Sequence, residues 1–255
     1  MTSEPVTPKQ LEILLLLYRF RFLNRIHIQK FLNHKTHSRI TPWLKDLTDR
    51  NIIHRIYSKT FTDIHTPAVY YLANKSRHIL KDHELCSDEV LSRVYREQHR
   101  SQTFRNHCLL LADLYFHFQT AAQRQNTTCH FYTATDLAGV AYAPQPLPDA
   151  YITIKDNKKI KRYFLDAFSD TAPMFAVRRR IHQYCRYYSG NYWQDHHRKT
   201  FPTILLICPS ERIKNSLLRF IPHQLVPEGV EISFYLALKE DIQKRGIQSD
   251  TWEAA

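Results

Sequence analysis

Glycine is scarce in this sequence, since only 4 of its 255 residues are glycine, against a usual share of about 7%. Neither G-x-G-x-x-G nor G-x-x-x-x-G-K-[ST] occurs, which excludes both glycine-rich nucleotide-binding motifs. Long apolar runs are also missing. A membrane span needs about 18 apolar residues, and the most apolar N-terminal run, Ile13–Tyr18, is much shorter and lacks the cleavage site of a signal peptide. We therefore expect a cytoplasmic protein that does not enter a membrane.

A recognisable cysteine motif is missing as well. The five cysteines are odd in number and widely spaced, and no C-x-x-C occurs, so a disulfide framework and a zinc ribbon are both disfavoured. The histidine-containing pairs His107-Cys108, Cys129-His130 and His196-His197 lack the spacing of a structural zinc site. We predict reduced thiols, no metal site and no cofactor, with Mg²⁺ needed only if the chain were a nuclease.

Acidic residues are outnumbered, with 24 Asp and Glu against 36 Lys and Arg and a formal net charge of +12. The excess lies in two regions: residues 1–84 hold 14 basic and 7 acidic side chains, and residues 129–200 hold 11 and 6. Basic surfaces attract phosphates and release their counterions, which is typical of nucleic-acid binding. The alternative is a solvated basic face without a ligand.

The first eighty-four residues contain three helix starts, each marked by a capping residue. These are Thr7, which a proline follows, then Asn24, and then Thr36 or Ser38. The third helix carries an apolar stripe at helical spacing and is expected to end at Asn51.

A β-hairpin is expected after these helices, with strands at residues 52–57 and 68–72 and a polar loop at 58–67. Three helices and a hairpin are the order of a winged helix-turn-helix, whose third helix enters the major groove of DNA. The polar side chains on the third helix and the loop are types that contact bases and phosphates. They are His37, Ser38, Arg39, Thr41, Lys45 and Lys59. The alternative is a winged helix that binds a protein.

The remaining residues alternate between helices and strands in the order α-β-β-β-α-β-α-β. The elements are expected at residues 90–125, 129–132, 150–154, 162–168, 173–188, 203–208, 210–220 and 230–236. This order resembles the PD-(D/E)XK, or restriction-endonuclease-like, fold. The predicted fold class is therefore α/β for this part and α+β overall.

Two carboxylates resemble the acids of that fold family. Asp149 precedes the second strand and Asp166 lies in the third, and such a pair holds Mg²⁺ through oxygen ligands. The family's catalytic lysine is replaced by Phe168, while Gln183 and Tyr187 resemble a Q-x-x-x-Y element of RecB-like nucleases. The broken motif predicts an inactive scaffold, and a nuclease using these four polar residues is the alternative. In a purely structural role, Asp149 would be a turn residue and Asp166 would need a buried partner.

A second basic stretch lies in the helix expected at residues 173–188. Arg178, Arg179 and Arg180 precede several tyrosines, and arginines interleaved with aromatic residues can grip phosphates and stack unpaired bases. We predict that this run contacts DNA phosphates. The alternative is a solvated arginine face opposite an apolar core face.

Five segments carry a resemblance to a known family: Leu11–Leu14, Tyr18–Leu23, Tyr70–Leu72, Pro148–Ala150 and Phe164–Pro173. Over residues 5–240 the chain resembles the replication-relaxation family of bacterial mobile elements, which includes MobC-like relaxation accessory proteins. The family's acidic-x-acidic-x-x-Thr pattern fits here except that Phe168 replaces the second acid, which weakens any catalytic role. The resemblance implies DNA binding near an origin or transfer site, with a relaxase or replication protein as partner.

We therefore predict a winged helix-turn-helix at residues 5–84, an inactive nuclease-like domain at 88–240 and a flexible tail at 241–255. The predicted function is binding of double-stranded DNA for replication, transfer or gene control of a plasmid or other mobile element. A Mg²⁺-dependent nuclease and an adaptor for a relaxase or replication protein are the alternatives. Whether the chain forms a homodimer is left open.

Overall fold

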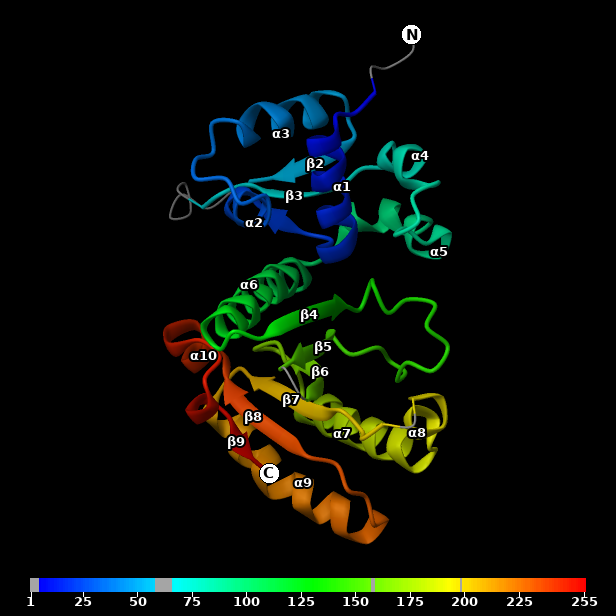
Figure 1. The fold of residues 1–255 in the computed structure, drawn as a ribbon, viewed down its shortest axis with the longest axis vertical. Helices are drawn as coiled ribbons and strands as arrows, with labels where there is room; N and C mark the ends of the chain where they lie inside the picture. Colours follow the sequence, from blue (N-terminus) through cyan, green and yellow to red (C-terminus); the bar gives the residue numbers. More distant parts are fainter. Residues whose placement is uncertain (1–4, 58–65, 157–158, 198) are drawn as a thin grey trace. The chain divides into compact units, whose positions relative to one another are not determined.

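The computed structural model describes residues 5–57, 66–156, 159–197 and 199–255 (Figure 1). They form a mixed α/β protein, as predicted, with one three-stranded and one six-stranded sheet. The chain divides into two compact units, Met1–Asp113 and Leu114–Ala255. Among the described residues, no helix has the length and apolar character that spanning a bilayer requires. None of the five cysteines, all of which are described, forms a disulfide, and burial raises the pKa of the Cys208 thiol to about 12.

The first unit begins with three helices and a small antiparallel sheet, and further short helices follow. Its elements are α1 Pro8–Phe20, β1 Leu23–Asn24, α2 Arg25–Phe31, α3 Ile40–Asp49, β2 Ile53–Ile56, β3 Val69–Leu72, α4 Ser76–Leu80, α5 Asp88–Leu91 and the 3-10 helix η2 Val94–His99. The strand order is β1-β3-β2, and the hairpin register pairs Ile53 with Leu72 and Ile56 with Val69.

Two of the predicted helix starts are confirmed by their hydrogen bonds. The Thr7 hydroxyl accepts from the Gln10 backbone N–H at 3.3 Å, and the Gln10 side chain accepts from the Thr7 backbone N–H at 2.9 Å. Asn24 caps α2 by accepting from the His27 backbone N–H at 2.9 Å. Each cap satisfies backbone donors that a helix start leaves without an internal partner.

The predicted start of the third helix at Thr36 or Ser38 is wrong, because α3 begins at Ile40. The Thr36 and Ser38 hydroxyls bond to each other at 2.9 Å and so cap no helix. A turn closes instead on the His37 carbonyl oxygen, which accepts from the Ile40 and Thr41 backbone N–H groups at 3.1 and 3.0 Å. The end of the helix is as predicted: Asn51 follows it with φ 55°, a conformation that asparagine tolerates.

The first unit extends past the predicted boundary at residues 84–88, to Asp113. Polar contacts hold the added segment in place. The Ser87 backbone N–H donates to the Tyr18 hydroxyl at 2.7 Å, and the Arg21 guanidinium donates twice to the buried Glu97 carboxylate, at 2.6 and 3.2 Å. The division of the chain therefore falls inside helix α6, Gln102–Arg124, rather than at a linker.

The second unit is built on the six-stranded sheet, in the order β4-β5-β6-β7-β8-β9. Its elements after α6 are β4 Thr128–Thr133, β5 Ala150–Lys155, β6 Ile160–Ala167, α7 Met174–Ser189, α8 Tyr192–His197, β7 Thr203–Cys208, α9 Glu211–Glu228, β8 Phe234–Leu238, α10 Lys239–Arg245, the 3-10 helix η3 Ser249–Thr251 and β9 Glu253–Ala254. Strands β4, β5 and β6 are antiparallel neighbours, whereas β6, β7 and β8 run parallel. The predicted order of strands and helices is confirmed from α6 to β8, with α8 added between α7 and β7 and α10 and β9 added after β8. The helix expected at residues 90–125 is shorter, because α6 begins at Gln102 and η2 precedes it.

Helices α7 and α9 cover one face of this sheet (Figure 1). Tyr184 of α7 and Leu217 of α9 belong to one buried cluster with Phe164, Leu206 and Phe234 from the three parallel strands. Each helix connects two parallel strands, and such crossovers need the length of a helix. The inner face of α7 is therefore fixed by the core, and its outer face is left to solvent.

The predicted flexible tail at residues 241–255 is ordered. β9 pairs with β8, with Leu236 opposite Glu253 and Tyr235 opposite Ala254. The Glu253 carboxylate also accepts from the Lys214 ammonium of α9 at 2.8 Å. An edge strand supplies backbone donors and acceptors to whichever segment reaches it, and this is why a short polar segment becomes ordered here.

We expect Arg21→Met to lower the free energy of unfolding by about 2 kcal/mol or more, because it leaves the buried Glu97 carboxylate without its cation. The matched control is Arg93→Met, which breaks an equally short bond of 2.6 Å to Glu89 between exposed side chains. This control should cost less than about 1 kcal/mol. Urea denaturation measures both, and equal losses would contradict a structural role for the Arg21–Glu97 pair.

Candidate nucleic-acid interface

The five candidate residues around α3 are all exposed. His37, Ser38 and Arg39 lie in the turn that precedes α3, whereas Thr41 lies in its first turn and Lys45 near its middle. Thr41 and Lys45 are four residues apart and so share one face of the helix. The structure thus brings the five predicted side chains together at the N-terminal end of α3.

Hydrogen bonds separate the anchored side chains in this group from the free charges. The Thr41 hydroxyl donates to the His37 carbonyl oxygen at 3.0 Å, and the Ser38 hydroxyl is bonded to Thr36. Within the part of the chain that the structure describes, neither Arg39 nor Lys45 has a carboxylate at ion-pair distance. Their charges are therefore available to an anionic ligand.

The acids of α3 lie farther along the helix. The Asp46 carboxylate accepts from the Gln10 side chain of α1 at 2.6 Å and from Arg50 at 3.1 Å. Its charge is thereby compensated within the unit. Among the described residues, Arg39 and Lys45 are therefore cations at α3 that no carboxylate compensates.

Lys59 lies outside the described residues, so its predicted contact stays a prediction. The described base of the hairpin presents another cation, because Arg55 and Tyr57 are exposed and the Arg55 guanidinium lies 5.2 Å from the centre of the Tyr57 ring. Sequence reasoning missed this pair. Period-two alternation places Arg55 and Tyr57 on the same face of the strand as the buried Ile53, so alternation gave no signal of their exposure.

Asp166 is held in a buried cluster of charged and polar side chains. The Arg180 guanidinium donates to both carboxylate oxygens of Asp166, from Nε at 2.7 Å and from Nη2 at 3.2 Å. The Tyr184 hydroxyl donates to the same carboxylate at 2.6 Å, and a third arginine nitrogen, Nη1, donates to the Pro146 carbonyl oxygen at 2.7 Å. Asp166 and Arg180 are each only 7% exposed.

The protonation states in this cluster follow from burial and charge. Burial alone would lower the pKa of the Arg180 guanidinium, but the charge and hydrogen bonds of Asp166 outweigh it and raise that pKa above its usual value. Burial, reinforced by the Asp166 charge, raises the pKa of Tyr184 well above its usual value. The guanidinium therefore stays charged and the tyrosine stays a neutral donor.

A Mg²⁺ ion does not fit this arrangement, because the Arg180 guanidinium already neutralises the Asp166 carboxylate that would bind it. Asp149 is engaged too, since its carboxylate accepts from the Ala167 backbone N–H at 2.8 Å. Among the described residues, no three His, Cys, Asp or Glu side chains gather as metal ligands would. The partner that the sequence required for a buried Asp166 is thus another side chain of the same unit.

The Q-x-x-x-Y pattern picks out the wrong tyrosine. The hydroxyl of Tyr187 donates to the Tyr142 carbonyl oxygen at 2.6 Å rather than to an acid of the predicted site. Gln183 is half-buried on α7. Tyr184 reaches Asp166 because it lies one helical turn after Arg180, on the same face of α7.

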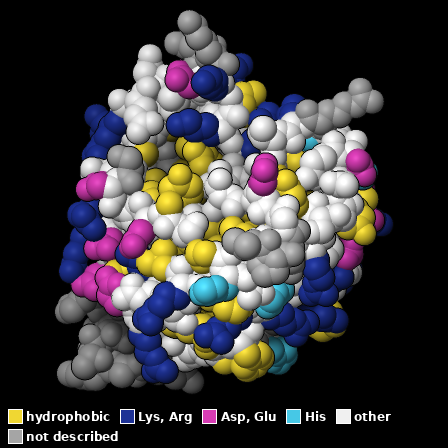
Figure 2. Space-filling model, turned by 90° about the horizontal axis from the view of Figure 1, so that it is seen from below, with side chains coloured by type: hydrophobic (Ala, Val, Ile, Leu, Met, Phe, Trp, Pro, Cys, Tyr) yellow, Lys and Arg dark blue, Asp and Glu magenta, His cyan; other side chains and the backbone are white. Residues whose placement is uncertain are grey.

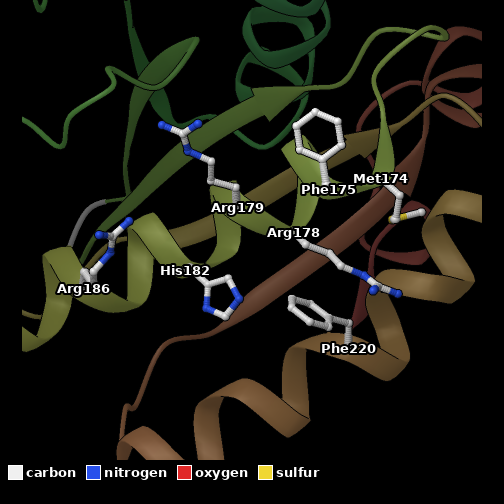
Figure 3. Close-up of a pocket in the computed structure, with 7 residues that line it drawn as sticks. All are labelled: Met174, Phe175, Arg178, Arg179, His182, Arg186 and Phe220. Atoms are coloured by element: carbon white, nitrogen blue, oxygen red, sulfur yellow. The ribbon is translucent and has the colours of Figure 1, made fainter.

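The arginine run of α7 divides between surface and core. Arg178 and Arg179 are exposed, as their predicted role requires, whereas Arg180 is buried on Asp166. Arg180 is therefore unable to contact DNA phosphates, and its assignment to the interface is wrong. Arg178 and Arg179 line a groove of about 830 Å³ together with Phe220 of α9. Figure 3 shows these side chains on α7 and α9.

The family model for replication-relaxation proteins matches residues 14–204 of this chain, which is most of its length. The protein is a replication-relaxation protein and belongs to that family. A comparison with curated proteins gives no match.

Solved structures that a comparison matches include a point mutant of ZitR from Lactococcus lactis, with a TM-score of 0.28 and 20% identity, covering 49% of this chain and 79% of ZitR. The restriction endonuclease FokI has a TM-score of 0.36 and 13% identity over 98% of this chain and 47% of its own. FokI bound to DNA has a TM-score of 0.32 and 12% identity over 98% of this chain. The chain spans about half the length of FokI, 47% and 48% in the two structures.

Asp166→Ala should lower the free energy of unfolding by about 3–5 kcal/mol, because it leaves a buried guanidinium without its counter-ion. Asp170→Ala is the matched control. Its carboxylate is exposed and lies 4.0 Å from Lys239, so its loss should cost less than about 1 kcal/mol. Urea denaturation compares the two, and similar midpoints would show that the Asp166 cluster contributes little to folding.

Proposed function

We propose that this replication-relaxation protein binds double-stranded DNA through the N-terminal half of α3, as an accessory factor in replication, transfer or gene control of a mobile element. The observation that carries the proposal is the exposed group around α3, in which Arg39 and Lys45 lie without a carboxylate partner among the described residues. A helix-turn-helix places the N-terminal residues of its second helix against base edges. A relaxase or replication protein is the protein partner that we propose.

The hairpin supports the same mode of binding. Arg55 and Tyr57 extend the exposed basic surface along the strand that leads to the loop. Arginine and tyrosine are both common donors to DNA phosphates. Contacts from a helix and a hairpin of one unit would fix the orientation of the protein on the duplex.

We propose that the second unit acts as a scaffold without catalytic activity. The supporting observation is the Arg180 guanidinium on Asp166, in the place where a nuclease would need a metal ion. The lysine expected two residues after that acid is Phe168. These features favour DNA binding over the nuclease alternative.

Arg39→Ala should weaken binding of a 30-base-pair duplex of random sequence, and the slope of log affinity against log salt should become shallower by about 0.9 if the residue contacts one phosphate. If Arg39 also contacts a base, Arg39→Ala should weaken binding of a duplex selected for tight binding by about 1–3 kcal/mol relative to the wild type. Fluorescence anisotropy across a salt series measures both effects.

Arg93→Ala is the matched control, because it removes one exposed arginine of the same unit that is already paired with Glu89. Wild-type binding by Arg39→Ala would overturn the assignment of α3 and favour the adaptor alternative. Mg²⁺ is included in the buffer and the DNA is examined on a denaturing gel afterwards. Cut strands would overturn the scaffold role of the second unit.

A further inference from the structure

The groove between α7 and α9 has a lining that combines positive charge with aromatic surface (Figure 3). Its lining residues are Met174, Phe175, Arg178, Arg179, His182, Arg186 and Phe220. Three arginines and a histidine are therefore gathered in a recess that contains no carboxylate. The face drawn in Figure 2 likewise shows Lys and Arg side chains beside His and hydrophobic side chains.

The arginines of this groove differ in what surrounds their guanidinium groups. The Arg178 guanidinium lies 4.9 Å from the centre of the Phe220 ring, and the His182 ring meets the same phenylalanine edge-on at 5.6 Å. Arg179 and Arg186 extend to one side of α7 in Figure 3 and have no ion-pair partner among the residues that the structure describes. They are seven residues apart, or about 10 Å along the helix, so they reach two different anionic groups.

Phe175 is the most exposed large apolar side chain of the described residues, with 72% of its surface open to solvent. It lies one helical turn before Arg178 and Arg179. A phenylalanine in this position adds nothing to the core of the unit. Its ring is free to stack on a flat partner that enters the groove.

We propose that this groove binds single-stranded DNA, with Arg179 and Arg186 on successive phosphates and Phe175 stacked on an unpaired base. Interleaved arginine and aromatic side chains are the means by which proteins hold single strands without sequence preference. A stacked duplex offers no free base face to Phe175, and an acidic peptide offers phosphate-like charge without a ring to stack. The site lies in the other unit from α3 and is independent of the duplex binding proposed above.

The test compares binding of a fluorescein-labelled 20-nucleotide oligothymidylate and of a duplex of equal length to the full-length chain. Phe175→Ser should weaken binding of the single strand roughly tenfold, as expected for loss of one stacked base, with duplex binding unchanged. Arg179→Gln combined with Arg186→Gln should make the slope of log affinity against log salt shallower by about 1.4, since each phosphate contact to a single strand contributes about 0.7. All these side chains are exposed, so thermal unfolding should stay at the wild-type temperature.

The matched control is Lys161→Gln combined with Lys244→Gln, which removes the same charge from exposed sites outside the groove. Equal weakening by this control would overturn the proposal, because it would show attraction by net charge alone. Unchanged binding of the single strand by Phe175→Ser would overturn it as well. So would competition by polyglutamate as strong as that by unlabelled oligothymidylate, which would indicate an acidic protein partner. Arg39→Ala should weaken binding of the duplex but not of the single strand. The experiment therefore tests the proposed duplex site and the proposed single-strand site independently.

Discussion

The second unit depends on how a carboxylate is accommodated inside an apolar strand. Asp166 lies among the buried residues of β6, and an ionised carboxylate in such a place is costly unless it is paired and hydrogen-bonded. Arg180 supplies the opposite charge and Tyr184 supplies a further donor. Because Arg180 also donates to the Pro146 carbonyl oxygen, one guanidinium fixes β6, α7 and the segment before β5 against each other.

This pairing bears on the nuclease alternative. In a metal-dependent nuclease, two acids on neighbouring strands bind a divalent cation whose charge is used in the reaction. Here the cation is a side chain, held by the same core contacts that place α7 on the sheet. The charge of Asp166 is paired within the fold, which supports the proposed scaffold role of this unit.

Much of the fold could be predicted from the sequence because its signals are local. Caps such as Thr7 and Asn24 act within three residues, and the alternation of strands and helices follows from periodicity. The start of α3 was misplaced because Thr36 and Ser38 are equally good caps and turn formers. The environment of Arg180 could not be predicted from the sequence. It depends on which residue of α7 faces Asp166 of β6, fourteen positions earlier in the chain. Likewise, the Q-x-x-x-Y pattern selected Tyr187. Only the rotational position of each residue around α7 shows that Tyr184 is the tyrosine that faces Asp166.

The arginine run shows how one local sequence serves two purposes. Successive residues of an α-helix point about 100° apart, so Arg178, Arg179 and Arg180 cannot share one environment. Arg180 points inward and cancels the charge of Asp166, while Arg178 and Arg179 point outward beside a groove without acids. In α3, Asp46 is compensated by Gln10 and Arg50, whereas Lys45 beside it has no carboxylate partner among the described residues. In both units, an acid near the basic residues is bound within the fold, and cations such as Lys45 and Arg179 keep their charge at the surface.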